Sequence, residues 1–175
     1  NGRVGLSIAA GWAAPDFAIK PDGFANAKQT MFEAADIVRR LWRGETVPFP
    51  GPQGEVQVRT LPRPIQKELP LWVTTAGNID TYTQAAKLGA NVLTHLLGQT
   101  LEEVSEKVRA YRRAWTEAGH SGKGTVTLML HTFVGPDSDA VERAVHQPLK
   151  DYLKSAMFLV KSAAWQFPTF KKMSV

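Results

Sequence analysis

The segment Thr75-Ala76-Gly77-Asn78 combines small residues with a side chain that can cap a helix. It follows an apolar run typical of a buried strand and precedes a helical pattern that begins near Ile79. Small residues let backbone N–H groups approach an anion, and the N-terminus of the next helix offers partial positive charge. The pattern predicts a phosphate-binding turn, although a capped turn without a ligand has the same local sequence. It is not a Walker loop, and no GxGxxG motif follows any predicted strand.

Two histidines, His95 and His131, lie late in apolar runs that are typical of strands. An imidazole there could act as an acid or base, or donate a hydrogen bond to a cofactor ring. A structural role is the alternative, so both are candidates and the catalytic residues stay unknown. Their spacing matches no metal-ligand motif and carboxylates are lacking nearby, so we expect no metal site. A GxSxG motif for a serine nucleophile is also absent from the sequence.

Two further groups follow predicted strands, namely Ala10-Gly11-Trp12 and Thr94, which precedes His95. Trp12 could pack over a planar cofactor, or it could simply cover the core. The chain has no cysteine, which excludes disulfides, thiolate metal ligands and a cysteine nucleophile. Redox chemistry would therefore need a bound cofactor.

Composition limits the class of protein. The 175 residues are 43% hydrophobic and 21% charged, as in one globular domain, and no apolar run is long enough to span a bilayer. We expect a cytoplasmic protein without membrane contact. The net charge of +5 is spread without an aromatic-interleaved basic patch, so nucleic-acid binding is not expected, whereas a phosphorylated cofactor would suit this charge. Glu102, Glu103, Glu106 and Lys107 are predicted to form a solvated helix face.

Strand and helix patterns alternate along the chain. The predicted strands cover residues 3–9, 71–75, 91–97 and 126–134. The predicted helices cover residues 24–43, 79–88, 101–118 and 139–161, the last irregular at Pro148. A proline-rich stretch over residues 47–69 surrounds a run that alternates with period two, which predicts an irregular β-hairpin.

This alternation predicts an α/β fold with a parallel sheet and right-handed crossovers. Four βα units are half of a TIM barrel, which usually needs about 250 residues. We therefore predict a partial TIM (β/α)8 barrel with a β-hairpin insertion, and an open doubly wound sheet is the alternative. In both folds ligands bind at the C-terminal ends of the strands, where the candidate residues lie. Residues 1–175 would form one domain that is incomplete at both ends.

Several segments in order resemble luciferase-like flavin monooxygenases, especially the subgroup associated with polyketide and nonribosomal peptide assembly lines. The resemblance runs from Asn1 to about Lys172. Its segments are RVGLSIAAGW with the following Asp16-Phe17, FEAADIVRRLWRGE, EVQVRTLPRPIQKELPLWVTTAG, LGANVLTHLLGQ and VTLMLHTFVG.

The resemblance implies a TIM barrel that binds reduced FMN, supplied by a separate flavin reductase, and uses O2 to oxygenate a small-molecule or carrier-bound substrate. It implies that Thr75–Asn78 hold the FMN phosphate and that Ala10, Gly11, Trp12 and Thr94 line the flavin site. His95 and His131 would face the flavin or substrate. Relatives often have Ser or Thr at the position of Ala10, so a hydroxyl contact is missing there.

The resemblance also implies that residues handling the oxygenated flavin precede this chain. A half barrel would expose apolar strand faces and sheet edges, so we expect a dimer or association with a complementing chain. Two alternatives remain, a non-catalytic remnant that binds flavin or a partner, and a deazaflavin-dependent oxidoreductase of the same superfamily.

Overall fold

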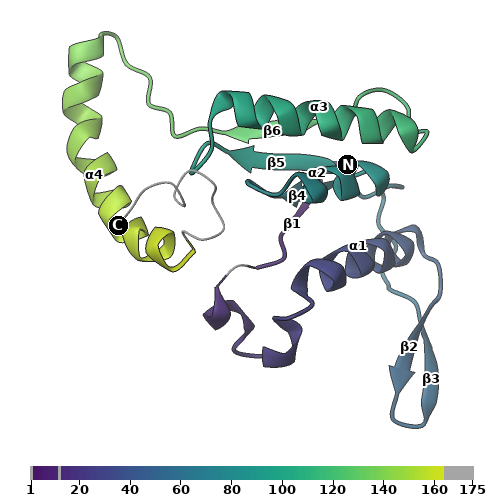
Figure 1. The fold of residues 1–175 in the computed structure, drawn as a ribbon. Coiled ribbons are helices and arrows are strands. Elements are labelled where there is room, and N and C mark those ends of the chain that lie inside the picture. Colours follow the sequence, from purple (N-terminus) through teal and green to yellow (C-terminus); the bar gives the residue numbers. More distant parts are fainter. Residues whose placement is uncertain (1, 12, 164–175) are drawn as a thin grey trace.

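The computed structural model describes residues 2–11 and 13–163, with side chains described up to residue 155. Within these residues, strands β1 (Leu6–Ile8), β4 (Leu71–Thr74), β5 (Asn91–His95) and β6 (Val126–Met129) form a parallel sheet in the order β1-β4-β5-β6 (Figure 1). Helices α1 (Ala27–Arg43), α2 (Ile79–Lys87) and α3 (Leu101–Glu117) connect them, and α4 (Ser138–Ala163) follows β6. The predicted alternation of strands and helices is confirmed.

The core distinguishes between the two predicted architectures. Buried residues of the sheet such as Leu71 and Val73 pack in one cluster with Met31 of α1, Tyr82 of α2 and Tyr111 of α3. The three connecting helices therefore cover the same face of the sheet, whereas a doubly wound sheet has helices on both faces. With sequential strand order, this arrangement is that of a partial TIM barrel.

The opposite face of the sheet would line the interior of a barrel. Alternation along the strands places Ser7, Trp72 and Thr74 on this inner face. Ser7 and Thr74 share a hydrogen bond between their hydroxyls at 2.7 Å, and the indole Nε1 of Trp72 donates to Oγ1 of Thr127 at 3.2 Å. Trp72, Leu93 and His95 are half-buried, because the described part of the chain leaves this face open.

The helix ends follow local capping rules. Asn78 caps α2 by accepting from the N–H of Asp80, and Thr100 and Glu103 form a reciprocal capping box at the start of α3. Gly44 ends α1 in the left-handed region, at φ +86°. Helix α4 runs without a break over Ser138–Ala163 with Pro148 inside it, and because proline has no N–H to donate, the predicted irregularity at this position stays a prediction. In the described part of the chain, no helix is long and apolar enough to cross a membrane.

The start of the first helix was predicted too early. Residues 14–17 and 21–23 form short 3-10 turns, η1 and η2, and α1 begins at Ala27. Pro15 and Pro21 lie at the first or second position of these turns, where a missing N–H costs little.

Strands β2 (Val47–Gly51) and β3 (Gly54–Val58) form the predicted antiparallel hairpin, which projects from the body of the molecule (Figure 1). The segment that returns from the hairpin is fixed to α1. Arg63 donates to the carbonyls of Leu41 and Trp42, and Nε1 of Trp42 donates to the carbonyl of Gln66 at 2.8 Å.

The two outer strands are shorter than predicted. In place of residues 3–9 and 126–134, β1 covers Leu6–Ile8 and β6 covers Val126–Met129. The end of β6 has a physical reason, because Met129 is in register with His95, the last residue of β5. Beyond it the neighbouring strand offers no further ladder partners.

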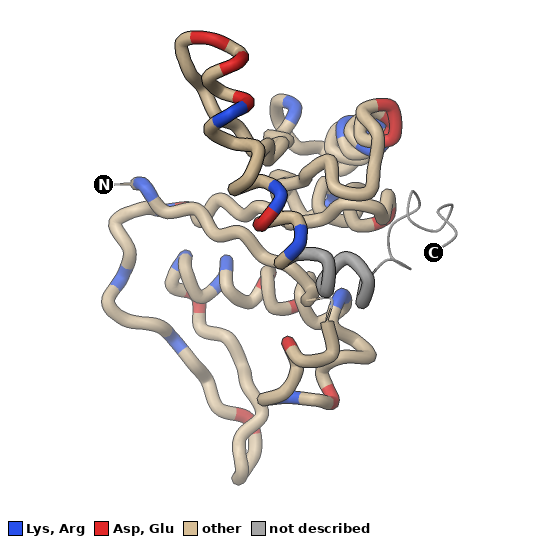
Figure 2. Tube along the Cα trace, turned by 90° about the vertical axis from the view of Figure 1, so that its left-hand side faces the viewer, with Lys and Arg blue, Asp and Glu red and all other residues tan. Residues whose placement is uncertain are grey.

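Lysines and arginines are interspersed with acidic residues along the chain (Figure 2).

Candidate functional site

The C-terminal ends of the four strands meet at one edge of the sheet, because all of them are parallel. This edge brings together the residues that follow β1, the turn after β4 and the end of β5. The grouping predicted from the sequence, Ala10-Gly11 with Thr75–Asn78 and His95, therefore lies along one edge, as the parallel arrangement requires.

The turn Thr75–Asn78 joins β4 to the N-terminus of α2. The N–H of Thr75 continues the ladder by donating to the carbonyl of Leu93 at 3.0 Å. The N–H groups of Ala76 and Gly77 have no hydrogen-bond partner among the described residues. These half-buried donors, next to a helix N-terminus, fit a phosphate group.

The first turn of α2 also carries an opposing charge. The N–H of Asp80 donates to Oδ1 of Asn78 at 2.8 Å, so the cap of α2 is internally satisfied. The carboxylate of Asp80 stabilises the helix N-terminus but repels an anion bound there. The turn thus offers two N–H donors to an anion, whereas the charge of Asp80 opposes one.

His95 ends β5 on the inner face of the sheet, since Thr94 before it points the other way. Its Nδ1 accepts from the N–H of Leu97 at 3.1 Å. An accepting Nδ1 puts the proton of a neutral ring on Nε2, which then is a donor. Burial lowers the pKa of His95, so the neutral form is favoured at neutral pH. The ring is thus suited to donate a hydrogen bond rather than to carry a charge.

Thr94 faces the helices. It is 1% exposed, and its Oγ1 accepts from the hydroxyl of Tyr82 at 2.9 Å and from Nε2 of Gln99 at 3.1 Å. Its side chain therefore belongs to the core between β5, α2 and the start of α3. The prediction that Thr94 contacts a cofactor is not supported by the direction of this side chain.

His131 does not lie in a strand, because β6 ends at Met129. It is exposed in the loop before α4, and its ring lies 4.9 Å from that of Tyr152, between ring centroids. The structure therefore separates the environments of the two candidate histidines: one is half-buried at a strand end and the other is exposed on a loop.

The residues after β1 have distinct environments. Ala10 packs against the core cluster. Gly11 has φ +76°, and a Cβ there would lie 2.9 Å from the ring of Phe17, so this turn requires glycine. Trp12, predicted to line the flavin site, lies outside the described residues.

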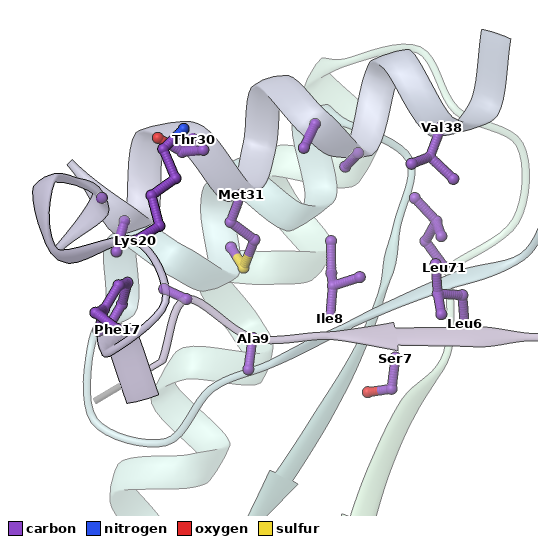
Figure 3. A pocket seen from close by; sticks show the side chains of 15 residues that line it. Leu6, Ser7, Ile8, Ala9, Phe17, Lys20, Thr30, Met31, Val38 and Leu71 are labelled. Carbon is purple, nitrogen blue, oxygen red and sulfur yellow. The ribbon is translucent and has the colours of Figure 1, made fainter. Parts of the chain in front are cut away.

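An apolar cavity of about 560 Å³ lies between β1 and α1. Ile8, Met31 and Leu71 point into it, whereas Ser7 points to the other side of β1 (Figure 3). Lys20 and Thr30 lie at one end. The cavity is thus on the helix-covered face, not on the inner face where His95 lies.

Gln99 and Lys107 form a buried polar pair that the sequence patterns do not predict. Both residues are 7% exposed, and Nζ of Lys107 donates to Oε1 of Gln99 at 2.6 Å. Lys107 is therefore not on a solvated face as predicted. A signal was present, because Lys107 falls on the helical stripe that also contains Val104, Tyr111 and Ala114.

Solved structures share this fold. Monooxygenase RslO1 from Streptomyces bottropensis matches with a TM-score of 0.76 and 20% identity, over 93% of this chain and 50% of that one. The oxygenating constituent of 3,6-diketocamphane monooxygenase from Pseudomonas putida, a type II Baeyer-Villiger monooxygenase in complex with FMN, matches with a TM-score of 0.62 and 18% identity. This match covers 82% of this chain and 43% of that one.

An F420-dependent secondary alcohol dehydrogenase in complex with an F420-acetone adduct also matches, with a TM-score of 0.61 and 21% identity over 82% of this chain and 44% of that one. The chain spans about half the length of these solved structures. A comparison with curated proteins gives no match.

The family model for luciferase-like monooxygenases matches residues 1–172, which is nearly the whole sequence. Together with the barrel-type sheet and the strand-end turn, this match identifies the chain as a member of the luciferase-like monooxygenase family.

Proposed function

We propose that this chain contributes to a monooxygenase that uses reduced FMN and O2 to oxygenate an organic substrate in natural-product biosynthesis. One oxygen atom would enter the substrate and the other would leave as water, with the electrons coming from the reduced flavin. Family membership and an FMN-bound structural neighbour support this function. A separate flavin reductase and a small-molecule or carrier-bound substrate are part of the proposal.

The observation that carries the proposal is the turn Thr75–Asn78. Its Ala76 and Gly77 N–H groups are unpaired within the described residues and stand before the N-terminus of α2. A terminal phosphate such as that of FMN would accept from these donors. The polar groups of the inner face, including His95, continue from this edge onto the surface where the rest of the cofactor would lie.

His95 would then act as a hydrogen-bond donor to the flavin or substrate. Its Nδ1 is occupied by the N–H of Leu97, so Nε2 is the nitrogen that carries the proton of the neutral ring. A neutral donor can stabilise negative charge that develops on a neighbouring oxygen without releasing its proton.

The first experiment is a titration of the chain with FMN, followed by flavin fluorescence, with gel filtration to report the size of the complex. Ala76→Asp adds a carboxylate to the turn, and Ala76→Asn is the uncharged control of nearly equal size. We expect Asp to weaken FMN binding at least tenfold more than Asn does. Equal affinities for the two variants, or no saturable binding by the unmodified chain, would contradict the proposed phosphate site.

A deazaflavin-dependent oxidoreductase is the second candidate, favoured by the F420-dependent structural neighbour. Competition between FMN and F420 for the same chain separates the two functions. Tighter binding of F420, without flavin-dependent incorporation of oxygen from labelled O2, would favour the second candidate. FMN binding without oxygen incorporation would instead indicate a flavin-binding remnant. Gel filtration of the same samples tests the proposed dimer or complementing chain.

A further inference from the structure

A chain of buried polar groups connects α3 to the end of β5. Nζ of Lys107 donates to Oε1 of Gln99 at 2.6 Å. Nε2 of Gln99 in turn donates to Oγ1 of Thr94 at 3.1 Å and to the carbonyl of His95. Lys107, Gln99 and Thr94 are all at most 7% exposed, so water does not compete strongly for these bonds.

The lysine fixes which way the Gln99 amide faces. An ammonium group can only donate, so it must meet the amide oxygen of Gln99. The amide nitrogen then faces β5, where Oγ1 of Thr94 and the carbonyl of His95 are both acceptors. Donors and acceptors therefore alternate correctly along the whole chain, and a rotated amide would place two donors together at Lys107.

The same turn sets the tautomer of His95. The carbonyl of His95 is held by Gln99, and the N–H of Leu97, within the same turn, donates to Nδ1 at 3.1 Å. The N–H of Gln99 closes the turn on the carbonyl of Leu96 at 3.3 Å. Movement of this backbone would misalign the Leu97 N–H with the ring, so the tautomer depends on the turn being held.

We infer that Gln99 and Lys107 are positioning residues for His95: they hold the β5–α3 turn so that His95 is the Nε2–H tautomer at the inner face of the sheet. The use of that tautomer toward flavin or substrate rests on the proposed function. The positioning itself does not, because it is a property of the protein without cofactor.

The arrangement also accounts for a lysine in a buried position. Burial lowers the pKa of Lys107, while Glu103 and Glu106 on the same helix raise it. An apolar residue at this site would remove the donor to Oε1 of Gln99, so the amide would be held only from its β5 side, by Thr94 and the carbonyl of His95. Lys107 thus contributes orientation, whereas a purely structural contact would contribute only stability.

The test is nitrogen NMR of the histidine rings in the folded chain at neutral pH. Gln99→Glu keeps the shape of the side chain but removes both amide donors, and Lys107→Met keeps its length but removes the charge. Arg113→Met removes one charge from an exposed position on the same helix and is the control. The signals of His95 are assigned by their loss in His95→Gln, and the three other histidines of the chain are internal references.

In the unmodified chain one hydrogen bond to Nδ1 should favour the Nε2–H tautomer roughly tenfold. Gln99→Glu and Lys107→Met should each lower this preference to about twofold, the value expected when that hydrogen bond is weakened. Arg113→Met should leave it unchanged, and Lys107→Arg, which keeps a donor, should retain most of it. The signals of His120, His131 and His146 should stay in place in every variant.

Folded Gln99→Glu and Lys107→Met variants with an unchanged His95 tautomer would overturn the inference, whatever their effect on thermal stability. If Lys107→Met does not fold, Gln99→Glu alone decides. FMN titration of the same proteins keeps this outcome separate from the proposed function. A chain that binds no FMN but shows the expected tautomer change would support the positioning role and reject the cofactor.

Discussion

Replacing Thr94 with valine tests whether this residue serves the core or a cofactor. Valine keeps the branched shape of threonine and removes only the oxygen. The hydroxyl of Tyr82, which is 0% exposed, and one amide hydrogen of Gln99 would then lose their acceptor. The expected effect is a loss of folding stability without a direct loss of cofactor contacts.

The magnitude follows from the number of donors left unpaired. Each buried donor without a partner costs roughly 1–3 kcal/mol, so the loss of both should lower the free energy of unfolding of Thr94→Val by about 2–6 kcal/mol. Tyr82→Phe removes one donor but leaves Thr94 bonded to Gln99, and should cost about 1 kcal/mol. In the double variant no tyrosine donor is stranded, so its cost should be about 1–2 kcal/mol less than the sum.

Urea unfolding followed by tryptophan fluorescence measures these values, with Thr94→Ser as the control that keeps the oxygen and loses a methyl group worth about 1 kcal/mol. A loss of unfolding free energy below about 0.5 kcal/mol for Thr94→Val would refute the reasoning, because each unpaired buried donor should cost more than that. A double variant whose loss equals the sum of the losses in Thr94→Val and Tyr82→Phe would refute it as well. Unchanged stability together with lost FMN binding would instead restore Thr94 as a cofactor contact.

Three further outcomes are expected. Gly124→Ala should lower the free energy of unfolding, measured with urea, by more than about 2 kcal/mol, because its φ is +64° and a Cβ would clash with the buried Tyr111 hydroxyl. Gly122→Ala is the control, since Gly122 has a similar φ but open space around it, and it should cost only about 1 kcal/mol. Asp80→Asn should tighten FMN binding by about twofold to fivefold in the fluorescence titration, since it removes a repulsive charge at the N-terminus of α2; weaker binding would contradict a phosphate there. The free energy of unfolding should fall as pH decreases below about 6.5, because the lowered pKa of His95 means that the unfolded chain takes up its proton first. In His95→Gln this part of the pH dependence should vanish, and an unchanged slope would contradict it.

The elements of the fold were largely predictable from local sequence. Apolar runs of β-branched residues, a helical stripe in each connecting segment and capping residues such as Thr100 and Gly44 each act over a few neighbouring positions. The same local signals placed the turn Thr75–Asn78 between a strand and a helix. Errors were confined to strand lengths and to the start of α1, because strand ends depend on where the partner strand stops.

The direction of individual side chains was less predictable. Thr94 and His95 are adjacent in the sequence, yet one is buried against α2 and the other lies on the inner face. Lys107 was expected in solvent because it is charged, but its place on the apolar stripe of α3 put it in the core, where Gln99 satisfies it. In each case a partner from another element decided the outcome.

By itself the sequence determined the strand–helix alternation, the parallel sheet and the turn of small residues before α2, because these depend on periodicity and on residues next to one another. The tertiary structure alone decided that α1, α2 and α3 share one face of the sheet, which makes the fold a partial barrel. It also decided that Lys107 and Gln99 meet behind His95, since these hydrogen bonds join residues whose contact depends on how α3 packs against β5.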